Sequence, residues 1–235
     1  MKKVILSLFG LAACLSADLV AEATPMKKYE AQNFDKLLGH VEGLNDDLLK
    51  MHFKLYQGYV TNTNLLIDKI QALNIDGKAP PPEFAGFKHM LGWEFDGMLL
   101  HELYFGNLGG AKQPLKQDDP LMRNMIADFG SYENWKNDFI STGAMRGIGW
   151  AILYREPNLG RLINVWINEH DLGHLAGGAP ILVMDVFEHA YITQFGLDRA
   201  GYIKVFFDNI DWTVVSRRFK DAANIEGEGG VILKF

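Results

Sequence analysis

The sequence predicts an α+β protein in which an N-terminal helical hairpin domain precedes an α/β domain with a small three-stranded antiparallel sheet. Three observations support this fold class. Apolar residues recur at helical steps in the first half, a polar segment at 111–120 interrupts them, and short β-rich runs follow. We expect the hairpin domain at 44–110, a linker at 111–120 and the α/β domain at 121–219.

Two long helices are expected in the hairpin, at 44–73 and at about 83–107. Apolar side chains in the first recur every three or four residues, which places them on one helix face. Asn45 is a suitable N-cap, because its side chain can accept a hydrogen bond from the first turn. A proline run at 80–82 separates the helices, and Gly109 marks the end of the second.

The second half changes from helical to strand periodicity. After two short helices at about 121–130 and 132–143 come three runs rich in β-branched and aromatic residues: GIGWAILYRE, GRLINVWINEH and PILVMD. Short runs with tight turns between them favour an antiparallel sheet. The helical pattern returns at 187–195 and at 201–219, and the glycine-rich end at 220–235 is expected to be a peripheral tail.

The N-terminus has the layout of an export signal over residues 1–23. Two lysines precede a short apolar run, which ends in small residues and an Ala-Glu-Ala cleavage site. We therefore expect an exported protein, periplasmic or extracellular, in which residues 24–43 form an N-terminal extension. The alternative is a lipid anchor, because LAAC, which ends at Cys14, resembles a bacterial lipobox.

The composition restricts the possible partners. Of 235 residues, 48% are hydrophobic and 22% are charged, as in a globular protein with a substantial core. The formal net charge of -6 argues against nucleic-acid binding, which needs a basic surface, but it is compatible with a small anionic substrate. Cys14 is the sole cysteine, so no disulfide is expected, and no stretch is long and apolar enough to span a membrane.

Three histidines and one aspartate are candidate metal ligands. His52, His101 and His189 lie in helical contexts beside large apolar residues, and Asp185 ends an apolar run. Each histidine alone is most simply interpreted as a hydrogen-bonded core residue. Buried imidazoles need partners for their ring nitrogens, however, and one metal ion would serve all three. Such a ligand set suits Fe, Mn or Zn, and spacing alone does not choose among them.

Several segments carry a family resemblance. In chain order they are HFKLYQGYVTNTNLL, HELYF, FGSYENWKNDF, GIGWAIL and PILVMDVFEHAY. The last is followed by RAGY at 199–202 and by NIDW at 209–212. Together they resemble the iron/manganese superoxide dismutases over about residues 44–219.

This resemblance implies one mononuclear Fe or Mn ion per subunit, with a solvent molecule as an additional ligand. The protein ligands that it implies are His52, His101, Asp185 and His189. It also implies that superoxide is the substrate. Alternation between M(III) and M(II) would oxidise one superoxide to O2 and reduce a second, with two protons, to H2O2. The alternative is a non-catalytic metal-binding protein on the same fold.

The chain departs from the family at the residue that hydrogen-bonds the solvent ligand. Most members use a glutamine from one of two positions. Here Gly97 stands at one of them, and the other region contains no glutamine. We predict that His170 takes this role, with His174 as the competing candidate. Because neither common glutamine pattern applies, iron or the use of both metals is slightly favoured.

Other residues of the expected site follow from the resemblance. Tyr59 is the expected gateway, a phenol that passes a proton and limits access to the metal. Trp150 and Phe187 are expected to wall the site. Glu188 is expected to reach across a homodimer interface to the ring N–H of the partner subunit's His189.

His52 is the least regular of the expected ligands. It precedes Tyr59 by seven residues where the common family helix has eight, and Met51 stands at eight. Either His52 binds from an adjusted helix or the first ligand is lost, because a thioether is a poor ligand for Fe(III) or Mn(III). We expect His52, which shares a helix face with Tyr59. Tyr56 and Ile192 replace a family pair that meets across the dimer, so that pairing is not expected.

Overall fold

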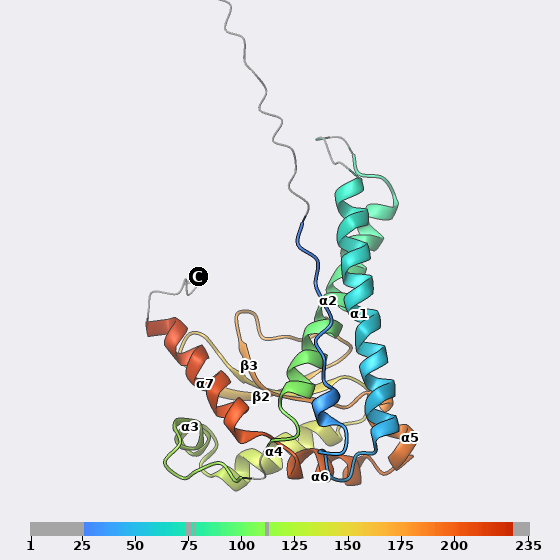
Figure 1. Cartoon of the computed structure of the whole chain (residues 1–235). Helices are drawn as coiled ribbons and strands as arrows, with labels where there is room; N and C mark the ends of the chain where they lie inside the picture. The colour runs from blue at the N-terminus through green and yellow to red at the C-terminus, as the bar shows by residue number, and fades with distance from the viewer. Residues whose placement is uncertain (1–25, 74–76, 78, 111–112, 228–235) are drawn as a thin grey trace, which may run out of the picture.

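The predicted α+β architecture is present (Figure 1). In this computed structural model the described residues are 26–73, 77, 79–110 and 113–227. Within them, a helical hairpin precedes a three-stranded antiparallel sheet that is flanked by further helices, which confirms the predicted fold class. The expected export signal, Cys14 and the last part of the expected tail lie outside the described residues.

The hairpin consists of two long helices, α1 (Asp46–Ala72) and α2 (Glu83–Gly106), which stand side by side in Figure 1. Asn45 caps α1 as predicted, since its side-chain oxygen accepts a hydrogen bond from the backbone N–H of Leu48 at 2.7 Å. The buried side chains of α1 recur at helical spacing and pack against α2. Burial of this shared face holds the two helices together.

The segment predicted as an N-terminal extension packs into the core from Phe34 onward. It contains the 3₁₀ turn η1 (Asp35–Leu37), and both Phe34 and Val41 are buried in the core. Further upstream, the backbone of Tyr29 exchanges two hydrogen bonds of 2.9 Å with the side-chain amide of Asn64 on α1. The residues before α1 are therefore anchored along the hairpin, as the blue trace in Figure 1 shows.

The sheet contains β1 (Trp150–Arg155), β2 (Leu162–Ile167) and β3 (Ala179–Asp185) in the order β2-β1-β3. Both pairings are antiparallel, as predicted. In the register of β1 against β3, Trp150 lies opposite Asp185. The sheet thus brings an expected wall residue and an expected ligand to the same end.

Helices cover the sheet and complete the core. The remaining long ones are α3 (Pro120–Phe129), α4 (Tyr132–Ala144), α6 (Arg199–Asp208) and α7 (Trp212–Gly227). α4 packs on β1 and β2, whereas α2 and α7 pack on β3. β3 therefore lies directly beside the hairpin. Over the described part of the chain, no helix combines the length and apolar character that a bilayer span requires.

Two predicted helix extents were wrong. The helix predicted at 201–219 is divided into α6 and α7, because the side chain of Asn209 bonds the backbone of Glu42 and Asp211 accepts a hydrogen bond from the first turn of α7. α7 also continues to Gly227, into the predicted tail.

The segment 187–195 is likewise not one helix. It contains the 3₁₀ turn η2 (Glu188–Ala190) and the one-turn helix α5 (Ile192–Phe195). The break occurs at Tyr191, whose φ of -147° is outside the helical region.

Candidate metal centre

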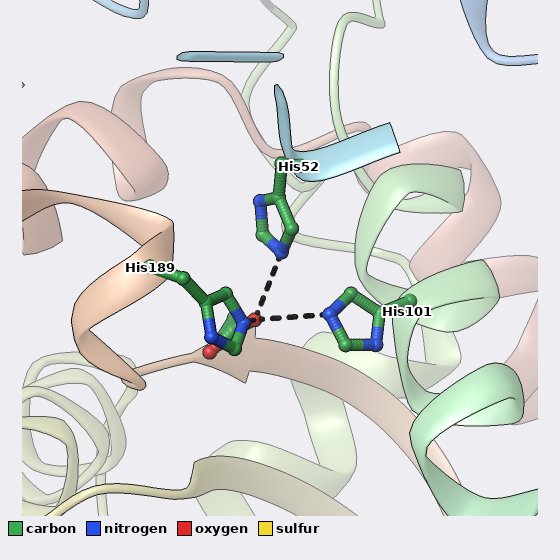
Figure 2. A group of neighbouring side chains, drawn as sticks. His52, His101 and His189 are labelled. Atoms are coloured by element: carbon green, nitrogen blue, oxygen red, sulfur yellow. Dashed lines mark hydrogen bonds and ion pairs between the residues drawn. The ribbon is translucent and has the colours of Figure 1, made fainter. Parts of the chain in front are cut away.

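Four side chains from four separate elements converge on one point. They are His52 of α1, His101 of α2, Asp185 at the end of β3 and His189 of η2, and one potential ligand atom of each lies within 4.8 Å of the others. The Nε2 atoms of His52 and His189 are each 3.1 Å from Asp185 Oδ2, and that of His101 is 3.6 Å away. Figure 2 shows the three imidazoles approaching from different segments. The structure therefore brings all four predicted ligands together.

The turn after β3 sets the direction of the Asp185 carboxylate. Oδ1 accepts a hydrogen bond from the backbone N–H of Phe187 at 2.8 Å, which leaves Oδ2 facing the histidines. The peptide of Asp185 is held as well, because its carbonyl oxygen accepts a hydrogen bond of 2.7 Å from the hydroxyl of Tyr202. The 3₁₀ turn then returns His189 to the same carboxylate. The interrupted helix is thus the local structure that joins these two ligands.

His101 supplies the clearest test of whether a metal ion fits. Its Nδ1 lies 2.5 Å from the carbonyl oxygen of Gly97, and a carbonyl can only accept, so Nδ1 carries the proton. Nε2 therefore presents a lone pair. It is fully buried and has no hydrogen-bond partner among the described residues. A metal ion fits this atom, and a backbone carbonyl on the other ring nitrogen is usual for a histidine ligand.

The electrostatics of the cluster favour the protonation states that a metal site needs. Burial lowers the pKa of His52 and His101, although Asp185 opposes this effect, so both imidazoles are neutral at pH 7. Burial alone would raise the pKa of Asp185, but His189 and His52 outweigh it and lower the pKa, so the carboxylate is ionised. Neutral imidazoles and a carboxylate are suitable donors for iron or manganese.

His52, not Met51, occupies the first ligand position. α1 is a continuous helix through this region, and it turns the imidazole of His52 into the cluster while Met51 is 45% exposed. The His52 side chain also packs edge-on against Phe105. The irregular spacing from Tyr59 is therefore compatible with a site that includes His52.

His170 and Tyr59 lie at the edge of the cluster and contact one another. The indole N–H of Trp150 donates to Nδ1 of His170 at 3.1 Å. Burial lowers the pKa of His170 to about 4, against the opposing influence of Asp185, so the ring is neutral at pH 7 and its proton is on Nε2. Nε2 lies 2.7 Å from the hydroxyl oxygen of Tyr59 and donates to it.

The second candidate, His174, contacts the backbone of His170, and within the described residues no hydrogen bond or ring contact joins it to the four ligands. Its Nε2 is 2.7 Å from the carbonyl oxygen of His170, and its Nδ1 is 2.6 Å from the hydroxyl of Tyr154. Of the two histidines predicted as alternatives, His170 is the one whose ring contacts Tyr59, and its hydrogen bond to a metal-bound solvent molecule stays a prediction.

Gly97 makes room for this arrangement. A Cβ atom at Gly97 would lie only 2.6 Å from Cδ1 of Tyr59, well inside van der Waals contact. A glutamine at this position would therefore displace the Tyr59 ring, which stacks on His101 with ring centroids 5.1 Å apart. In this chain, the ring of Tyr59 fills the space beside Gly97 into which a glutamine side chain would extend.

Aromatic rings enclose the cluster. Trp150 is fully buried with its ring edge-on to His101 at 5.0 Å, and Phe187 stacks on His189 at 5.1 Å. Trp93 of α2 also extends the wall, because its ring centroid lies 4.6 Å from that of His170. The predicted wall residues are thus in place around the ligands.

Glu188 is exposed, in contrast to its buried neighbours Phe187 and Ala190. Its carboxylate makes no hydrogen bond or ion pair within the described residues. The structure therefore leaves its predicted role between subunits as a prediction.

Two supporting residues were missed by the sequence reasoning. The sequence motifs include Tyr202 only within RAGY, and they do not include Asn107, which bonds the backbone of Val183 in β3. The polar Asn107 among large apolar residues at the end of α2 is the signal that could have found it.

Comparison with known proteins agrees with the geometry. Residues 117–218 match the family described as iron/manganese superoxide dismutases, C-terminal domain. The chain is 34% identical over 184 residues to an iron superoxide dismutase of Cupriavidus metallidurans, an alignment that spans 77% of this chain and 90% of that relative. The chain belongs to the iron/manganese superoxide dismutase family. This confirms the resemblance that the motifs indicated.

The relatives of this chain include proteins named for iron and proteins named for manganese. The chain is 33% identical over 190 residues to an iron superoxide dismutase of Aquifex pyrophilus, covering 78% of this chain and 87% of the relative. It is 30% identical over 195 residues to manganese superoxide dismutase 2 of Haloferax volcanii, covering 82% and 94%. Similarity to the family therefore does not choose between iron and manganese.

Proposed function

We propose that the protein is a superoxide dismutase, an oxidoreductase that converts two superoxide ions to O2 and H2O2. The observation that carries this proposal is the convergence of His52, His101, Asp185 and His189 within 4.8 Å, with a bare, buried Nε2 on His101. A bound iron or manganese ion supplies the one-electron redox chemistry, and the protein supplies protons, shape and a dry environment.

Tyr59 is the residue best placed to deliver a proton. Nε2–H of His170 donates to its oxygen, so the phenol must direct its own O–H elsewhere, and its ring stacks on His101. Burial raises the pKa of Tyr59, with further contributions from Asp185 and Glu94, so the phenol stays protonated at neutral pH. It can therefore act as a general acid toward a product that needs two protons.

His170 orients this acid and does not relay protons. An indole N–H does not ionise at neutral pH, so the hydrogen bond from Trp150 keeps Nδ1 of His170 occupied. The histidine therefore offers only Nε2–H, in a fixed direction. The buried rings of Trp150 and Phe187 limit the entry of water to this region.

Metal analysis combined with a superoxide dismutation assay tests the proposal. We expect one iron or manganese ion per subunit and rapid dismutation, both of which are lost in His101→Ala. Bound metal without turnover would support the alternative, a non-catalytic metal-binding protein on this fold. Elemental analysis of protein from its own host would decide between iron and manganese, and we propose iron or the use of both.

We also propose a homodimer formed around Glu188 and His189. The exposed carboxylate of Glu188, which has no partner among the described residues, adjoins His189, whose side chain is 26% exposed. Exposed apolar residues of α1 and α5 also occur: Met51, Leu55 and Ile192. Sedimentation equilibrium of wild type and Glu188→Ala tests this proposal. A monomeric wild type would exclude it.

Export rests on the N-terminal sequence, and we propose a periplasmic or extracellular location. Mass spectrometry of the mature protein separates the two forms of processing. Cleavage after Ala23 would leave a free N-terminus at Thr24, whereas a lipidated protein would begin at Cys14 with an added acyl mass.

A further inference from the structure

His170, whose ring contacts Tyr59, lies on a loop and not on a helix or strand. His170 belongs to the connection between β2 and β3, and the backbone turns into it through Glu169, whose φ is +69°. Among the described residues, Glu169 is the only non-glycine residue with a positive φ. Such a conformation is unfavourable for a glutamate and persists only where surrounding contacts enforce it.

His174 makes one of the contacts that hold this turn, which is also closed by a backbone bridge between Asn168 and Leu172. Its Nε2 donates to the carbonyl oxygen of His170 at 2.7 Å, because a carbonyl can only accept. In the neutral ring, Nδ1 is then the acceptor for the hydroxyl of Tyr154 at 2.6 Å. Burial, with a contribution from Asp96, raises the pKa of Tyr154, so that phenol keeps the proton it donates.

This one side chain therefore connects the peptide of His170 to a strand of the sheet. Tyr154 belongs to the central strand β1, and Asp96 of α2 lies 3.8 Å from Nε2 of His174. Trp150 and Tyr59 hold the two ring nitrogens of His170, but neither holds its backbone. Without His174, the ring could follow the loop when the loop moves.

We propose that His174 is a positioning residue, which fixes the backbone of His170 so that Nε2–H is aimed at the oxygen of Tyr59. The inference rests on the proposed function for its consequence in turnover. It predicts that loss of His174 weakens the contact between His170 and Tyr59 without changing the four ligands. A displacement of ~1 Å in a catalytic array can reduce turnover by up to ~100-fold.

The test compares His174→Leu with His174→Gln in the full chain. Leucine removes both hydrogen bonds, whereas glutamine can donate to the carbonyl of His170 and accept from Tyr154. In metal-free protein, solvent exchange of the His170 Nε2–H, followed by ¹⁵N NMR, should become about tenfold faster in His174→Leu and stay near wild type in His174→Gln. In the metal-loaded enzyme, kcat should fall about tenfold in His174→Leu, with KM and metal content unchanged.

Two further variants separate positioning from general damage. Tyr154→Phe removes the anchor on β1 and should accelerate exchange by about threefold, and it carries the test if His174→Leu does not fold. His89→Leu changes an exposed histidine of α2 and should leave both readouts unchanged. Wild-type exchange in His174→Leu, or equal defects in the leucine and glutamine variants, would overturn the proposal. An inactive wild type with the expected exchange pattern would instead reject the proposed function.

Discussion

The side chain of Asn107 pairs with the backbone of Val183 in the manner of a neighbouring strand. Nδ2 donates to the carbonyl oxygen of Val183, and Oδ1 accepts from its N–H, both at 3.1 Å. Asn107 directly follows α2, which carries His101, and Val183 lies two residues before Asp185. This pair therefore sets the end of the hairpin against the strand that delivers the carboxylate ligand.

Asn107→Ala should destabilise the protein by about 2–4 kcal/mol, because it leaves the N–H and carbonyl of Val183 buried without partners. It also removes an acceptor of Arg218, which bonds Asn107 Oδ1 at 3.0 Å. Urea unfolding of the metal-free protein measures the effect. Asn137→Ala, at an exposed position on α4, is the control and should change stability little. An equal loss in both variants would contradict the role assigned to Asn107.

Gly97→Ala should destabilise the protein by about 1–3 kcal/mol, since the added Cβ would overlap the ring of Tyr59. The control is Gly92→Ala in the same helix, where the nearest atoms are at 3.6 Å. Because glycine is less favourable than alanine inside a helix, this control should stabilise the protein by about 0.5–1 kcal/mol. In a Tyr59→Ala background, the cost of Gly97→Ala should largely disappear, and a double-mutant cycle by urea unfolding measures this coupling.

Tyr59→Phe should lower kcat about tenfold, because it removes the proton donor and keeps the ring that stacks on His101. Metal content should not change. Stopped-flow decay of superoxide measures the rate, with Tyr29→Phe, at an exposed tyrosine of the N-terminal segment, as the control. If Tyr59→Phe were as fast as wild type, another group would have to supply the protons.

The metal-free protein should lose stability on acidification through the histidines of the site. The pKa of His170 is about 6.5 in the unfolded chain. In the folded protein, burial lowers this pKa to about 4, although Asp185 opposes the effect. The unfolded state therefore binds the proton first. Stability from neutral His170 is fully present above pH 6.5 or so and is lost as the pH falls toward 4, by at most about 3 kcal/mol. Urea unfolding between pH 7 and 4 should show a shallower loss in His170→Gln.

The ligands were predictable from sequence because their signals are local. Asp185 and His189 lie within one short motif. In the same way, the residue type of Asn45 alone indicates the start of α1. The motif did not reveal that the helix after Phe187 is broken. That break depends on the backbone angles at Tyr191, which the residue type does not determine.

The hydrogen bonds of the supporting residues were not predictable, because their partners are distant in the chain or are backbone atoms. Asn107 and Val183 are 76 positions apart, and the partner of Asn107 is a peptide group that any residue could supply. The same holds for His174, whose acceptor is the carbonyl of His170. Sequence patterns indicate which side chains can donate or accept, but the orientation of a peptide group follows from the completed fold.

The ligand cluster also constrains when the site can form. His52 and Asp185 are 133 positions apart in the chain, and His189 lies further on. An ion held by all four residues closes a loop that includes most of the folded protein, and so it acts as a cross-link between the hairpin and the sheet. We therefore expect metal loading to be a late event in biogenesis, and a chain truncated before β3 should be unable to acquire its metal at all.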